Sequence, residues 1–133
     1  MNDRFRFRAF DKQDKELVYE AENTYDCQSC NGHTIWHDNF ACLLDDEERY
    51  TVEQCTGLKD KNDRLIYEGD IISATTFDEH NRQFIVKYAN EDACFGLFIT
   101  KSMYMLFNKV YDDSLEVIGN IHENSGLVED KNV

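Results

Sequence analysis

The chain has 133 residues, of which 41% are hydrophobic and 13% aromatic, and one domain of this length folds without a structural metal or a disulfide framework. Its formal net charge is -13, so a large phosphate-binding surface is excluded, because a body this negative repels phosphate backbones. The longest apolar run, residues 93–99, is far shorter than a membrane span, and the N-terminus lacks the apolar stretch of a secretory signal.

The first predicted element is a β-hairpin that carries the basic residues of the N-terminus. From Arg4 onward, arginine alternates with an apolar residue, and this period of two predicts a strand over residues 4–10 with Arg4, Arg6 and Arg8 on one face. A polar turn over residues 11–15 and a strand over residues 17–19 complete the hairpin. Residues 1–15 carry a charge of +2 and the rest of the chain -15. The three arginines are interpreted as a solvated face and as candidate interaction residues.

The polar segment that follows contains the candidate metal ligands Cys27, Cys30, His33 and His37. Thiolates and imidazoles are zinc ligands, and the two cysteines have the usual spacing of one ligand pair. Only two residues separate Cys30 from His33, whereas structural zinc sites place about a dozen residues between their ligand pairs. We therefore expect a loop without metal or cofactor, and a small metal-binding or enzymatic domain stays an alternative.

The remainder of the chain is predicted to consist of short strands. Acidic residues 45–48 could begin a helix, but the β-branched and aromatic residues after them favour a strand over residues 49–56. Further strands are predicted at residues 65–67, 71–75, 83–88, 95–100, 104–108 and 115–118. This spacing is typical of a meander or small barrel, and no helix of ten or more residues is predicted. Residues 11–20 and 60–68 share one pattern with a single gap, which indicates two hairpins with the same turn chemistry.

The five cysteines form an odd set, which favours reduced thiols in a cytoplasmic protein. Cys42, Cys55 and Cys94 each stand beside apolar residues and are predicted to be small buried side chains. The sequence lacks a Gly-x-Ser-x-Gly elbow, a phosphate-binding Gly-x-x-x-x-Gly-Lys loop and a His-Glu-x-x-His pair. Neighbouring acidic residues would point to opposite faces of a strand and form no carboxylate dyad. The chain is therefore predicted not to be an enzyme.

Three blocks of sequence resemble the YopX family of phage and prophage proteins. The longest block is residues 54–72, Gln-Cys-Thr-Gly-Leu-Lys-Asp-Lys-Asn-Asp-Arg-Leu-Ile-Tyr-Glu-Gly-Asp-Ile-Ile, and residues 6–11 and 115–124 resemble the opening and closing segments of the family. Phe10 replaces the usual tryptophan, Cys55 a common aromatic residue, and Asn62-Asp63 the usual Asn-Gly. The Cys27–His37 segment falls in the variable middle of the family, which lowers the expectation of a metal there. The resemblance implies an all-β fold with an SH3-like barrel in its C-terminal part and no established activity.

These observations lead to one set of expectations. The chain is predicted to be a single, mostly β domain, with a hairpin and variable segment over residues 1–56 and a barrel-like part over residues 57–133. Its predicted role is that of a non-enzymatic phage or prophage accessory protein in the bacterial cytoplasm, which binds a protein partner or itself. An acidic decoy that mimics nucleic acid for a host protein is an alternative, whereas direct nucleic-acid binding and membrane association are not expected.

Overall fold

The computed structural model describes residues 2–23, 40–124 and 126. The chain divides into two compact units, residues 1–55 and 56–133. Strand β3 (Tyr50–Lys59) crosses this division, so that its first part belongs to the first unit and its second part to the second. The mostly β fold class predicted from the sequence is confirmed.

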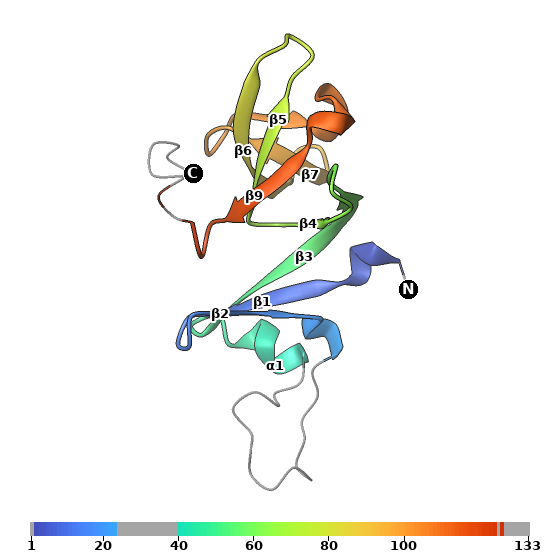
Figure 1. Cartoon of the computed structure of the whole chain (residues 1–133). Coiled ribbons are helices and arrows are strands. Elements are labelled where there is room, and N and C mark those ends of the chain that lie inside the picture. The colour runs from blue at the N-terminus through green and yellow to red at the C-terminus, as the bar shows by residue number, and fades with distance from the viewer. Residues whose placement is uncertain (1, 24–39, 125, 127–133) are drawn as a thin grey trace, which may run out of the picture. The chain divides into compact units, whose positions relative to one another are not determined.

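The first unit consists of a hairpin, the beginning of β3 and short helical elements. Its elements are the 3-10 turn η1 (Asp3–Phe5), β1 (Phe7–Asp11), β2 (Glu16–Tyr19), the 3-10 turn η2 (Ala21–Asn23), α1 (Phe40–Asp45) and β3. β1 is antiparallel to both β2 and β3, and the strand order of the sheet is β2-β1-β3-β4, where β4 is Leu65–Tyr67. α1 lies against one face of the β1–β2 hairpin (Figure 1). Leu43 of α1 is buried together with Ala9 of β1 and Tyr50 of β3 in a small apolar core.

The arginine pattern forms a shorter strand than the sequence predicts. Arg4 lies in η1, whose first turn is capped by the Asn2 side chain, and β1 begins only at Phe7. Arg8 is 0% exposed and lies opposite Glu53 of β3. The prediction of a solvated arginine face is therefore wrong for Arg8, because period-two alternation cannot distinguish a solvent face from one that a charged neighbour covers.

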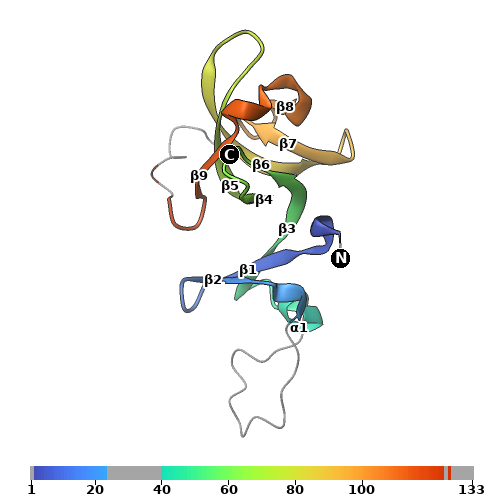
Figure 2. The same ribbon diagram turned by 45° about the vertical axis from the view of Figure 1, so that its right-hand side comes forward.

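The second unit is a strand meander that curls into a half-barrel (Figure 2). Its elements are β4 (Leu65–Tyr67), β5 (Asp70–Thr75), β6 (Asn81–Ala89), β7 (Cys94–Phe98), β8 (Tyr104–Leu106), the 3-10 turns η3 (Phe107–Lys109) and η4 (Asp112–Ser114), and β9 (Glu116–Asn120). The five-stranded sheet has the order β8-β7-β6-β5-β9, and all the pairs in it are antiparallel. The tight β4–β5 turn uses Gly69 at φ 84°, a conformation that other residues rarely adopt.

Alternating apolar residues build the core of the second unit. Phe84 and Val86 are two residues apart on β6 and point to the same face, where Ile72 and Leu97 of the neighbouring strands meet them. All four side chains are 0% exposed. Val110 and Leu115, from the segment between β8 and β9, close the same cluster. The meander is thus held by one continuous apolar layer.

The two hairpins with similar sequences do share their turn chemistry. In the first, Oδ1 of Asp11 accepts hydrogen bonds from the backbone N–H groups of Gln13 and Asp14. In the second, Oδ1 of Asp60 accepts from the residues two and four positions later, Asn62 and Arg64. Each turn also holds a residue at positive φ, Lys15 at 59° and Asp63 at 67°. The prediction of a common turn chemistry is confirmed.

Several smaller predictions need correction. Asp45 is the last residue of α1, a helix that the sequence analysis did not predict, whereas the strand predicted over residues 49–56 is present within β3. Residues 107–108, predicted as strand, belong to η3. Of the cysteines predicted to be buried, Cys55 is buried, Cys94 is partly buried and Cys42 is exposed. None of the helices in the described part of the chain is long and apolar enough to cross a membrane.

Candidate binding site on the second unit

The candidate site is a surface hollow between the β5–β6 turn and the segment that follows η3. These segments are fixed by backbone pairing, since Thr76 and Val110 form an antiparallel bridge. The N–H of Phe77 donates to the carbonyl of Lys109 at 3.2 Å, and the N–H of Tyr111 donates to the carbonyl of Thr75 at 2.9 Å. The bridge brings Phe77 and Tyr111, 34 positions apart in the sequence, to one surface.

Local hydrogen bonds hold both segments in place. The Ser114 hydroxyl accepts from the N–H of Thr75 at 2.8 Å and donates to the carbonyl of Tyr111 at 2.6 Å. On the other side, the Thr76 N–H donates to the carbonyl of His80 at 2.9 Å, which closes the β5–β6 turn, and the Thr76 hydroxyl donates to Asp78 within that turn. The backbone beneath the hollow is therefore preorganised before any ligand arrives.

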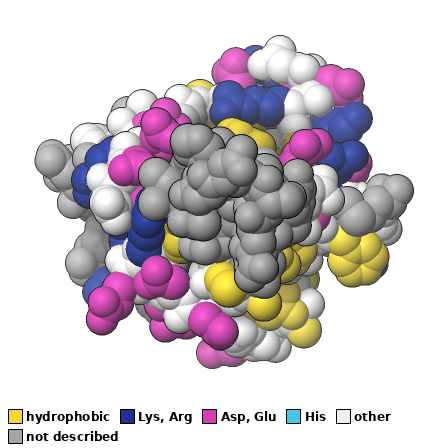
Figure 3. Space-filling model, turned by 90° about the horizontal axis from the view of Figure 1, so that it is seen from below, with side chains coloured by type: hydrophobic (Ala, Val, Ile, Leu, Met, Phe, Trp, Pro, Cys, Tyr) yellow, Lys and Arg dark blue, Asp and Glu magenta, His cyan; other side chains and the backbone are white. Residues whose placement is uncertain are grey.

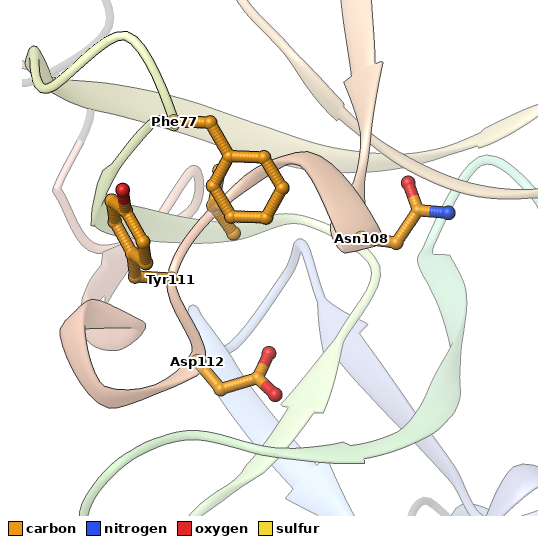
Figure 4. A pocket seen from close by; sticks show the side chains of 5 residues that line it. Phe77, Asn108, Tyr111 and Asp112 are labelled. Carbon is orange, nitrogen blue, oxygen red and sulfur yellow. The ribbon is translucent and has the colours of Figure 1, made fainter.

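Two exposed aromatic rings dominate the hollow. The ring centroids of Phe77 and Tyr111 are 5.0 Å apart with an interplanar angle of 58°, and the two residues are 55% and 41% exposed. In Figure 4 these rings, Asn108 and Asp112 surround an open space. Val110, which is buried in the core cluster, also lines the space, and its volume is about 450 Å³. Large exposed rings on a rigid backbone are typical of the anchor residues of protein interfaces.

The electrostatics of the hollow are acidic. Of the described residues that line it, Asp112 is acidic and none is basic. In the neighbouring turn, Asp78 contacts His80 at 3.4 Å and Arg82 at 4.0 Å, so these basic side chains are engaged locally. A hydrogen bond from the Thr76 hydroxyl lowers the pKa of Asp78, with a further lowering by His80. The site thus combines apolar rings with negative charge.

A second hollow of about 360 Å³ lies on the outer side of the β6–β7–β8 part of the sheet. It has a mixed lining, which is Lys87, Tyr88, Ala89, Asn90, Glu91, Phe98, Lys101, Ser102 and Tyr104. The Phe98 and Tyr104 rings stack at 4.7 Å, and Lys87 Nζ lies 5.8 Å from the Phe98 centroid. Lys87 and Phe98 already contact each other, so both are engaged before a ligand binds. This hollow is therefore a weaker candidate.

The Tyr104 hydroxyl donates a short hydrogen bond to Asp92. This bond, together with partial desolvation and the negative charge of Asp92, raises the pKa of Tyr104 to about 12. Tyr104 is therefore a neutral hydrogen-bond donor at physiological pH. No proton-transfer chemistry is indicated for it.

The structure does not bring the three predicted arginines together as one surface. Arg8 is buried and its Nε donates to Glu53 at 2.8 Å, with side-chain exposures of 0% and 6%. Arg6 pairs with Asp3 at 2.9 Å, and that hydrogen bond raises the pKa of the arginine. Arg4 is exposed, with its guanidinium 5.7 Å from the Phe5 centroid. Each arginine thus has its own surroundings.

The structure also shows a strong ion pair that the sequence does not predict. The Arg49 guanidinium donates two hydrogen bonds to Asp11, at 3.1 and 2.9 Å. These bonds lower the pKa of Asp11 and raise that of Arg49. The pair joins the β1–β2 turn to the start of β3 and has a structural role.

The zinc candidates Cys27, Cys30, His33 and His37 lie outside the described residues. Within the described ranges, no group of three histidine, cysteine or acidic side chains is placed to hold a metal ion. The described part of the chain therefore contains no assembled metal centre.

Phe77, Tyr111 and Asp112 were not singled out by the sequence analysis. Phe77 follows a strand of β-branched residues, and a large apolar residue in an acidic turn is the one local signal that could have marked it. The pairing with Tyr111 depends on the bridge between Thr76 and Val110, which no local pattern encodes.

Comparison with known proteins places the chain among proteins without a stated activity. A family model described as "YopX protein" matches residues 6–129. The chain is 29% identical to protein EF1440 from Enterococcus faecalis, whose crystal structure superimposes with a TM-score of 0.60 over 93% of this chain and 97% of that one. It is 15% identical to yopX from Bacillus subtilis, with a TM-score of 0.49 over 97% of this chain and 100% of that one. No curated protein matches the chain at a significant level.

Proposed function

The chain belongs to the YopX family, and from this premise we propose that it acts by binding another protein and not by catalysing a reaction. The observation that carries the proposal is the pair of exposed rings, Phe77 and Tyr111, on a backbone fixed by hydrogen bonds. Exposing an aromatic side chain forgoes about 1.5–3 kcal/mol of burial, which an interface recovers. We further propose that the protein is an accessory protein of a phage or prophage and works in the bacterial cytoplasm.

The proposal accounts for the distribution of rigid and exposed parts in the second unit. Interfaces gain most from a few aromatic anchors whose geometry is set before binding, because little conformational entropy is then lost. Thr76 and Ser114 fix the main chain at both rings of the hollow. In the proposed function, this rigid backbone presents the two rings to a partner protein.

Quantitative affinity capture from bacterial lysate tests the proposal. We compare the wild-type chain with Phe77→Leu, which removes one ring and keeps an apolar side chain. Phe5→Leu is the matched control, because Phe5 is 53% exposed and lies in the first unit. We expect at least one protein to be retained by the wild type and the control and to be lost with Phe77→Leu.

Two results would contradict this assignment. If no protein is enriched over background in repeated captures, protein binding as such is refuted. If the enriched proteins are lost with Phe5→Leu and kept with Phe77→Leu, the interface lies near the N-terminal arginines instead. Light scattering on the purified chain shows whether the partner is a second copy.

The acidic decoy remains a second candidate, because residues 16–133 carry a charge of -15. On the face drawn in Figure 3, however, acidic and basic side chains are interspersed. A nucleic-acid mimic needs a regular array of negative charge, which the coloured side chains of this face do not form. If a captured partner is released by excess DNA or RNA, the decoy function gains support; retention in excess nucleic acid and at high salt refutes it.

A further inference from the structure

We propose that the Phe77–Tyr111 hollow takes the charged end of a lysine or arginine side chain of the partner protein. This inference rests on the proposed protein-binding function and names the chemistry of the contact. Three observations support it: the exposed rings of Phe77 and Tyr111, the carboxylate of Asp112, and the net negative charge of residues 16–133.

The two ring faces of the hollow can attract a cation. A guanidinium or ammonium within about 6 Å of a ring centroid is attracted by the negative face of the ring. The chain uses this interaction internally, for instance with Arg49 at 5.1 Å from the Tyr50 centroid. Phe77 and Tyr111 are tilted by 58° to each other and bound the hollow from two directions (Figure 4).

The charged group that lines the hollow is negative. Asp112 contributes a carboxylate and Asn108 an amide to the lining, and both residues are exposed. An incoming anion would be repelled by Asp112. A purely apolar side chain would desolvate this carboxylate without replacing its bonds to water, which costs free energy. A cation at the end of an apolar stem suits both the aromatic rings and the Asp112 carboxylate.

The shape of a lysine or arginine side chain matches this arrangement. Its charged group reaches the ring faces and Asp112 in the hollow, while its methylene stem packs on the exposed apolar edges of Phe77 and Tyr111. The strongly negative charge of residues 16–133 also attracts a basic partner over longer distances, at low salt most of all. Charge complementarity therefore selects a basic surface as the occupant.

NMR titration of the full chain with small probes tests the inference directly. The probes are the Nα-acetyl methylamides of arginine and lysine, with those of citrulline and glutamate as the neutral and anionic comparisons. We expect saturable shifts of the Phe77 and Tyr111 ring resonances with the two cationic probes, weakened by added salt. Citrulline, which keeps the shape of arginine without its charge, should bind at least a few-fold more weakly.

Paired variants assign the binding to the hollow. Asp112→Asn and Phe77→Leu should each weaken the arginine probe by about two- to five-fold, as expected for an exposed ion pair or one exposed ring. Asp113→Asn is the control for charge, because Asp113 is also exposed but does not line the hollow. Phe5→Leu is the control for the ring. Both controls should leave the affinity within experimental error.

The outcomes separate this inference from the proposed function. Equal binding of citrulline and arginine, stronger binding of glutamate, or no ring shift with any probe overturns the inference. Equal losses with Asp112→Asn and Asp113→Asn also overturn it, because they indicate attraction by general negative charge. If the capture experiment still depends on Phe77 in that case, protein binding stands and only the cationic partner is wrong.

Discussion

Replacing Asp60 by asparagine tests how the second unit is held together, because this buried carboxylate joins a tight turn to a distant strand. Its Oδ1 accepts hydrogen bonds from the backbone N–H groups of Asn62 and Arg64, each at 2.9 Å, and its Oδ2 accepts one from Val117 at 2.9 Å. An asparagine side chain has one acceptor oxygen and an NH₂ group of two donors. In either orientation, one end of the amide therefore presents a donor to a backbone donor.

The expected cost follows from these contacts. A buried N–H left without an acceptor costs about 1–3 kcal/mol, and a hydrogen bond to a charged group contributes about 1.5–3 kcal/mol. Because asparagine keeps the volume and part of the bonding, we expect the free energy of unfolding to fall by about 2–3 kcal/mol at pH 7. With a urea m-value of about 2 kcal/mol/M, the unfolding midpoint falls by about 1–1.5 M.

The pH dependence of the free energy of unfolding shows how much of the effect comes from the charge of Asp60. Burial by itself would raise the pKa of Asp60, but the hydrogen bonds from the backbone N–H groups of Val117, Arg64 and Asn62 outweigh it and hold the pKa below its usual value of 3.8. The ionised form therefore stabilises the folded state fully above the usual value, and this stabilisation is lost as the pH falls through the lowered pKa. The difference between wild type and Asp60→Asn should be largest at pH 7 and shrink below pH 4.

Urea unfolding followed by circular dichroism at pH 7, 6 and 3 measures both effects. Asp63→Asn is the matched control, because Asp63 lies in the same turn with an 83% exposed side chain and its φ of 67° suits asparagine as well. We expect this control to change the free energy of unfolding by less than about 0.5 kcal/mol. A loss below about 0.5 kcal/mol for Asp60→Asn, or a loss that is undiminished at pH 3, would refute the reasoning.

Three further predictions concern other parts of the chain. Arg8→Met removes the guanidinium that pairs with buried Glu53, and it should lower the free energy of unfolding in urea by about 3–5 kcal/mol. Adding Glu53→Leu should recover most of this loss, and a loss below about 1 kcal/mol for Arg8→Met alone contradicts the prediction. In ultraviolet titration, Asp92→Asn should move the Tyr104 pKa down from about 12, with Tyr104→Phe identifying the signal; an unchanged titration would disprove the hydrogen bond. Neither zinc nor a chelator should shift the melting temperature, and a shift of several degrees that vanishes when the Cys27–His37 segment is mutated would establish a metal site.

The fold was predictable where its information is local. The hairpin turns at residues 11–15 and 60–64 each begin with an aspartate that accepts backbone hydrogen bonds, and this chemistry is visible in the sequence itself. The strands around β5 and β6 were found because β-branched and aromatic residues cluster there. Where a strand ends was less predictable, as at β8, because η3 follows without a proline or glycine to mark the change.

The candidate site was not predictable, because it depends on pairing between distant segments. Phe77 and Tyr111 meet through the bridge of Thr76 with Val110, and neither residue has a motif around it. The error at Arg8 has the same origin, since the partner that covers it, Glu53, is 45 positions away. Charge and composition carry no information about this hollow, which exists only in the tertiary arrangement.

The carboxylate of Asp60 also bears on the order in which the second unit assembles. Two of its hydrogen bonds reach residues two and four positions away, whereas the third reaches Val117 across 57 positions of sequence. A hairpin closes within about 1–10 μs, and long-range strand pairing is slower because a large loop must first be closed. We therefore expect Oδ1 of Asp60 to form its hydrogen bonds early in folding and Oδ2 to form its bond late. Folding rates of variants with substitutions near Asn62 and near Val117 would show which of the two contacts forms first.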